Sequence, residues 1–90
     1  MIIQIPENTK VISSKLVTEL AENQGERRET ITEVQIPESV TEIGLNAFRG
    51  CTRLTEIMIP TSVTKIGKIA FGDCTSLREI QIPDLSLIHI

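Results

Sequence analysis

Residues 54–76, LTEIMIPTSVTKIGKIAFGDCTS, are the most informative stretch of this sequence, because the 23 residues before them are a close copy. Residues 31–53 read ITEVQIPESVTEIGLNAFRGCTR, and 13 of these 23 positions are identical in the following unit. A third copy opens with LREIQIP at residues 77–83. Self-similarity at a fixed period of this length is the signature of a repeat architecture, in which neighbouring units stack on one another.

The first half of each unit predicts a strand that ends at a proline. In residues 54–60, apolar and polar side chains alternate, which places Ile57 and Ile59 on one face of a strand and Glu56 and Met58 on the other. Pro60 has no N–H to donate to a ladder, so we expect it to end the strand and begin a turn.

The second half of each unit predicts a further extended segment and a compact turn. Val63 and Ile66 return to the core, and Gly67 follows where the chain needs either positive φ or a close backbone approach. The A-F-x-x-C spacing at residues 70–74 is typical of about one helical or 3₁₀ turn. One such unit cannot bury its apolar residues alone, so we expect stacked units to share a core.

The pattern L-x-x-I-x-I-P-x-x-V-x-x-I-G-x-x-A-F-x-x-C resembles the BspA-like, or Treponema-type, family of leucine-rich repeats, and residues 31–83 match it closely. The resemblance implies an α/β, β-rich fold. The implied fold is a right-handed leucine-rich-repeat solenoid of 23-residue coils, with short parallel strands on one face and short helical or 3₁₀ turns on the other. We expect the strands of the first face near residues 2–5, 33–36, 56–59 and 79–82.

We expect the solenoid to span residues 1–84, with repeats at 31–53 and 54–76 and a partial repeat at 77–84. The unit at residues 1–30 diverges, because it carries eight extra residues as a charged insertion near 22–29. Ser13 and the apolar residues after it predict a capped amphipathic helix before this insertion. The insertion is either a solvated loop of a divergent coil or a binding protrusion.

The six residues at positions 85–90, LSLIHI, do not follow the repeat, which predicts Val at position 86, Ile at 89 and Gly at 90. They resemble the in-frame translation of the transposase mosaic-end adapter used in sequencing libraries. We therefore expect a non-native tail, no site at His89, and a natural protein that continues past Asp84. The alternative is a natural apolar tail that caps the solenoid.

Composition and charge exclude several kinds of partner. The net charge of −3 and the scattered Lys and Arg residues argue against nucleic-acid binding. No apolar run approaches the ~20 residues that a membrane-spanning helix needs, so we expect no membrane insertion in this segment. Residues 1–6 lack the features of a signal peptide, which, read literally, favours an intracellular protein.

The two cysteines, Cys51 and Cys74, occupy the same position in successive coils. We expect free thiols that fill small core positions, since their side chains should point inward in parallel rather than toward each other. A disulfide stays open as the alternative, because strands of neighbouring coils lie ~4.8 Å apart. Two cysteines without further ligands do not make a zinc site, so we expect no metal and no cofactor.

The outward strand positions are the candidate partner-binding face, in two columns: Glu33, Glu56 and Glu79, then Gln35, Met58 and Gln81. Such a carboxylate ladder is a solvated face, a contact for a basic partner, or a cation site. A regular ladder on an open face lacks the isolated, desolvated pair that acid–base catalysis needs, and we find no catalytic constellation.

We therefore expect a protein–protein interaction module, not an enzyme. The resemblance implies an adhesive or ligand-binding segment of a larger cell-surface or secreted protein, whose protein ligand is unidentified. Two other hypotheses are an intracellular scaffold repeat and the non-catalytic arm of a secreted enzyme. The oligomeric state stays open, because the exposed ends of a solenoid can self-associate.

Overall fold

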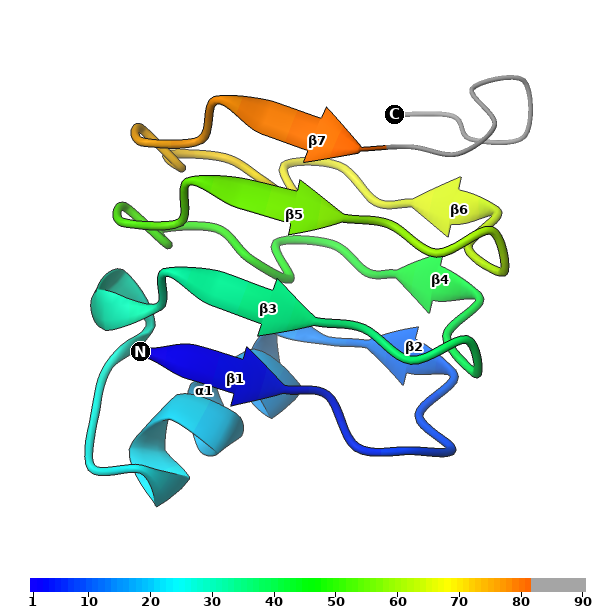
Figure 1. Cartoon of the computed structure of the whole chain (residues 1–90), viewed down its shortest axis with the longest axis horizontal. Helices are drawn as coiled ribbons and strands as arrows, with labels where there is room; N and C mark the ends of the chain where they lie inside the picture. Colours follow the sequence, from blue (N-terminus) through cyan, green and yellow to red (C-terminus); the bar gives the residue numbers. More distant parts are fainter. Residues whose placement is uncertain (82–90) are drawn as a thin grey trace.

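The chain forms stacked coils with short strands in front and behind, as the computed structural model of residues 1–81 describes them (Figure 1). The front strands are β1 (Ile2–Gln4), β3 (Glu33–Gln35), β5 (Glu56–Met58) and β7 (Glu79–Gln81). The rear strands are β2 (Val11–Ile12), β4 (Glu42–Ile43) and β6 (Lys65–Ile66). The first coil also contains the helix α1 (Ser14–Asn23), and the 3₁₀ helix η1 (Arg28–Thr30) leads into the second coil.

Every paired strand is parallel to its neighbour in the next coil. At the rear, β2, β4 and β6 form one continuous ladder, with Ile12 beside Ile43 and Ile43 beside Ile66. At the front, β1 pairs with β3 and β5 pairs with β7. No ladder joins β3 to β5 within residues 1–81, so the front face consists of two separate two-stranded sheets.

The front strands β1, β3 and β5 are each one residue shorter at their carboxyl ends than the sequence predicts. The expected strands ended at the isoleucine before each proline, whereas β1, β3 and β5 end one residue earlier. Pro6, Pro37 and Pro60 each follow that isoleucine, and a proline favours a turn and contributes no N–H to a ladder. The hydrogen bond from Ile5 N to Gln35 O (3.0 Å) shows that pairing nevertheless continues just past β1.

The helical turns predicted for the repeats are present only as hydrogen-bonded turns. Ala47 N donates to Gly44 O and Cys51 N donates to Phe48 O, which is 3₁₀-type spacing without a continuous helix. The backbone in this region bonds instead to the next coil, because Phe48 N donates to Ala70 O (2.8 Å) and Gly50 N donates to Gly72 O (2.9 Å). The N–H groups of Phe48 and Gly50 are therefore not available for helical hydrogen bonds within their own coil.

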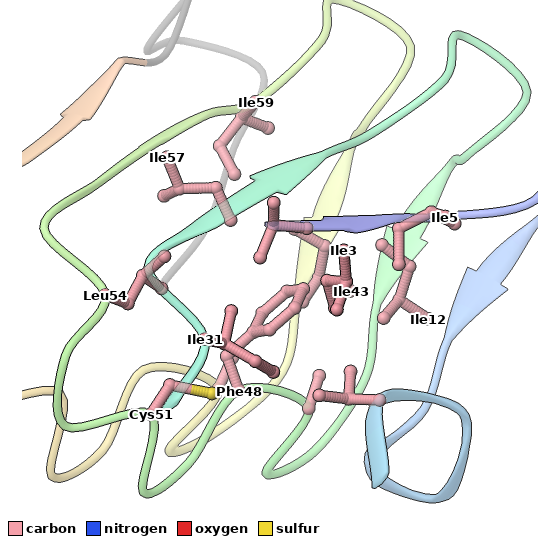
Figure 2. Packing of buried hydrophobic residues seen from close by; sticks show 14 of the residues in the cluster. Ile3, Ile5, Ile12, Ile31, Ile43, Phe48, Cys51, Leu54, Ile57 and Ile59 are labelled. Atoms are coloured by element: carbon pink, nitrogen blue, oxygen red, sulfur yellow. The ribbon is translucent and has the colours of Figure 1, made fainter. Parts of the chain in front are cut away.

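The core lies between the front and rear strands and consists of inward side chains from successive coils (Figure 2). Ile3, Ile31, Ile43 and Leu54 are fully buried within it. Phe48 is also buried, and its ring stacks on that of Phe71 with centroids 5.7 Å apart and an interplanar angle of 10°. These two rings form an aromatic column that joins successive coils.

Gly67 is required by close backbone approach and not by positive φ. A Cβ atom at this position would lie 2.6 Å from Leu45 N and 2.7 Å from Gly44 C in the preceding coil. Its equivalent, Gly44, has less crowded surroundings, with Ile12 O at 3.1 Å. Glycine therefore allows successive coils to approach each other closely at this point.

The divergent first coil contains the predicted capped helix. Ser13 is the N-cap of α1, and its hydroxyl accepts a hydrogen bond from Leu16 N (3.1 Å). Val17 and Ala21 bury the inner face of the helix against the core. The proposed non-native tail at residues 85–90 lies outside the described residues. Within residues 1–81, no helix is long and apolar enough to cross a membrane.

Candidate groove on the front face

The predicted binding residues lie on the front face in two columns. Glu56 is directly beside Glu79, and Met58 is beside Gln81, through the register of β5 and β7. Glu33 is half-buried, whereas Gln35, Glu56 and Glu79 are exposed, and Met58 is 64% exposed. For Gln81 only the backbone is described.

The two columns continue into the first coil, which the sequence reasoning did not include in the site. Ile2 pairs with Glu33 and Gln4 pairs with Gln35, so the glutamate column ends in an exposed isoleucine. The IIQIP motif at residues 2–6 carried this information, because it aligns with the strand and proline of the repeat. The acidic surface therefore does not extend over β1.

A groove of about 480 Å³ lies between β3 and β5, where the front ladder is interrupted. This volume is within the range of pockets that hold ligands in proteins. The groove brings four of the six predicted residues together and adds the turns that follow both strands. It is lined by Glu33, Val34, Gln35, Ile36, Glu38, Glu56, Ile57, Met58, Ile59, Pro60 and Thr61.

The backbone hydrogen bonds on either side of the groove show where the ladder stops. Thr32 N donates to Met1 O (2.8 Å) in the coil below, and Arg78 N donates to Thr55 O (2.9 Å) in the coil above. The corresponding bond between Thr55 and Thr32 is missing from the described part of the chain. The facing edges of β3 and β5 thus keep backbone groups that the ladder does not use.

The side chains of the groove are acidic and apolar. Its lining contains the carboxylates Glu33, Glu38 and Glu56 and no Lys or Arg residue. Gln35 Nε2 donates to Glu33 Oε2 at 3.4 Å, and Thr61 Oγ1 donates to Glu38 Oε2 at 3.4 Å. These contacts are long and leave other carboxylate lone pairs open to a cationic partner.

Sequence reasoning did not include Glu38, Pro60 and Thr61 in the site. These residues follow the strands, and an alternation rule selects only positions within a strand. A usable signal was present, because Glu38 and Thr61 occupy the same turn position in successive repeats. The hydrogen bond between them shows that the two turns lie side by side.

Burial makes both cysteine thiols less acidic than a free thiol. Both thiols are free, as predicted; Cys51 is fully buried and Cys74 is half-buried. Burial raises the pKa of Cys51 to about 12, and burial also raises the pKa of Cys74, whose thiol donates to Phe48 O (3.1 Å). Within residues 1–81, no three His, Cys, Asp or Glu side chains come together as metal ligands.

The charged insertion is held to the following repeat by Arg28. The Nη2 atom of Arg28 donates to Ser14 O, Ser14 Oγ and Thr18 Oγ1, at 2.8, 3.0 and 2.6 Å. Its Nη1 atom donates to Arg49 O (2.8 Å) and Ala47 O (3.4 Å). A second, polar hollow of about 550 Å³ lies beside it, between α1 and residues 25–29.

Stacked coils with parallel strands, a shared isoleucine-rich core and an open front face define a leucine-rich-repeat protein. The family model described as "BspA type Leucine rich repeat region (6 copies)" matches residues 18–90, and the chain belongs to this family. No curated protein and no solved structure matches the chain. Leucine-rich repeats of this kind generally mediate protein–protein interactions and are typically non-catalytic.

Proposed function

We propose that this chain is a non-catalytic recognition segment that binds a protein partner through its front face, and that it belongs to a larger cell-surface or secreted protein. The groove between β3 and β5 is the observation that carries this proposal, because it gathers Glu33, Gln35, Glu56 and Met58 into one concave site. Glu79 and Gln81 extend the same two columns on β7.

The proposal includes a right-handed solenoid over residues 1–84, with units at 1–30, 31–53, 54–76 and 77–84. The front strands all run in one direction and the rear strands in the opposite direction, coil after coil (Figure 1). Equivalent residues of successive coils therefore lie side by side on the front face. Extended surfaces of this kind suit protein ligands better than small molecules.

The interaction is testable by placing a photo-reactive amino acid on the front face. With p-benzoylphenylalanine at Gln35 or Met58, irradiation of the protein in extracts and culture medium of its source cells should give discrete cross-linked species. The matched control places the same group at Lys65, an exposed residue of the rear strand β6. Equal cross-linking from Lys65, or none from the front positions, would contradict the proposal.

An intracellular scaffold is the second candidate, and the two free thiols favour it. Disulfides are typical of secreted proteins, whereas Cys51 and Cys74 are both unpaired. Sequencing the natural locus on both sides of the coding region separates the two candidates. A signal peptide or wall anchor in the same frame supports the surface protein, and a signal-free complete frame supports the scaffold.

A further inference from the structure

We propose that the groove between β3 and β5 takes an extended peptide segment of the partner protein in which two basic side chains flank an apolar one. This inference rests on the proposed protein-binding function and names the chemistry of the partner. Two features of the groove support it: the order of charged and apolar side chains along its length, and the backbone edges of β3 and β5 that no ladder pairs.

One end of the groove is acidic on both strands. Glu33 on β3 and Glu56 on β5 both line this end of the groove, so a basic side chain that enters it faces a carboxylate on each strand. Two carboxylates side by side repel each other, and a lysine or arginine between them removes that repulsion. The first basic residue of the partner therefore belongs at this end.

The middle of the groove is apolar. Among the described residues, Met58 is the most exposed of the large apolar ones, at 64%, and it lines the groove together with Ile36, Ile59 and Pro60. A methionine thioether adapts its shape to irregular apolar partners. An aliphatic side chain of the partner would cover Met58 and remove this apolar surface from water.

The far end of the groove is acidic again at Glu38, where the chain turns after Pro37. Glu38 lies five residues beyond Glu33, and a fully extended stretch of this length would span roughly 16 Å, which the turn at Glu38 shortens. Two basic residues separated by three or four others in an extended peptide span a similar distance. The groove therefore matches a basic–apolar–basic pattern along one strand.

The backbone edges favour an extended partner over a helical one. The facing edges of β3 and β5 lack the ladder hydrogen bonds that their outer edges make with β1 and β7. Unpaired backbone groups beside an apolar groove gain from a partner that presents its own backbone donors and acceptors. An α-helix has no such groups to offer along its length.

The test is an NMR titration of the full 90-residue chain with two blocked heptapeptides, GRSLSRG and GESLSEG. The arginine peptide should shift the amide signals of residues 33–38 and 56–61, with a Kd that rises with salt. The double variant Glu33→Gln/Glu56→Gln should weaken this binding by about fivefold, the effect of an exposed ion pair. The matched control, Glu19→Gln/Glu22→Gln, removes two exposed charges from α1 and should leave the Kd unchanged.

Three results would overturn the inference: no binding of the arginine peptide, equal binding of the glutamate peptide, or equal weakening by the control variant. The cross-linking experiment above is independent of these results. If positions 35 and 58 cross-link to a protein while the arginine peptide does not bind, the front face is still supported as a protein-binding surface. The proposal of a basic peptide in the groove is then wrong.

Discussion

Ile69 occupies the position in its coil that Asn46 occupies in the preceding coil, and both residues adopt left-handed backbone, with φ of 57° and 59°. Asparagine tolerates this region, whereas a β-branched residue is a real outlier there. The side chain of Ile69 is also 54% exposed, so it recovers little by burial. The repeat therefore imposes a left-handed backbone conformation that suits Asn46 and strains Ile69.

Replacing Ile69 with asparagine should raise the free energy of unfolding by about 1 kcal/mol, because it relieves the left-handed strain. For a chain of this length, the gain corresponds to roughly 4–8 °C in Tm. Thermal and urea unfolding measure it, with Ile69→Val as the control, since valine keeps the β-branch. A lower Tm for Ile69→Asn would show that this side chain contributes packing that outweighs the strain.

Gly67→Ala should destabilise the stack by about 2–3 kcal/mol, because the new Cβ would meet the backbone of the preceding coil. Backbone atoms of Leu45 and Gly44 cannot move aside as a flexible side chain would. Gly25→Ala is the control, since nothing lies within 4 Å of its Cβ and only its φ of 71° opposes the change. Measured by urea unfolding, the free energy of unfolding of Gly67→Ala should be lower than that of Gly25→Ala by at least ~1 kcal/mol.

Arg28→Met should lower the free energy of unfolding by about 2 kcal/mol, since the variant keeps the aliphatic stem but loses every hydrogen bond of the guanidinium. Its five acceptors belong to α1 and to the turn of the second coil. Hydrogen exchange of the α1 amides should accelerate as well. Arg27→Met, at an exposed neighbouring position, should change neither measurement; if it does, net charge and not the hydrogen bonds is responsible.

Alkaline pH should destabilise the protein through Cys51, whose pKa is raised from 9.0 to about 12, mainly by burial. Above pH 9 the unfolded thiol ionises while the folded thiol stays protonated. The free energy of unfolding therefore falls as pH rises from about 9 toward 12, by up to ~1.4 kcal/mol per pH unit. Below pH 9 this contribution is fully present.

Urea unfolding at pH 8, 9 and 10 measures how the free energy of unfolding changes with pH. The variant Cys51→Ala shows how much of that change comes from the Cys51 thiol. The alanine variant should start less stable because it leaves a small cavity, but its loss of stability above pH 9 should be shallower. Iodoacetamide at pH 8 gives a second reading: half-buried Cys74 should react before Cys51, which becomes accessible on unfolding. Equal slopes for both proteins would assign the alkaline effect to other groups.

The sequence predicted the coils because their cause is local and repeated. The alternation around Ile57, the proline after each strand and the phenylalanine column recur at one spacing, so each repeat supports the same interpretation. The helix after Ser13 was equally predictable from its cap and apolar spacing. These features depend on neighbours within a few residues or on the equivalent position of the next unit.

The groove was not predictable from the sequence. The strands on its two sides, β3 and β5, show the same alternation of apolar and polar residues as the strands that do pair. Whether β3 and β5 form a ladder depends on how two whole coils tilt, which no local pattern encodes. Arg28 was missed for a related reason: within a charged run it resembles a solvated residue, although its partners lie 10–21 positions away. Four of the six predicted site residues still line the groove, and the boundaries of the binding face stay predictions.

The interrupted front ladder has a mechanical consequence for the joint between residues 31–53 and 54–76. These coils are fastened at the rear by β4 and β6 and by the bonds from Phe48 to Ala70 and from Gly50 to Gly72. Because residues 1–81 include no backbone hydrogen bonds between β3 and β5 in front, we expect the joint to flex about its rear edge, as a hinge does. A partner seated in the groove would then fix the curvature of the stack, and with it the angle between the coils on either side.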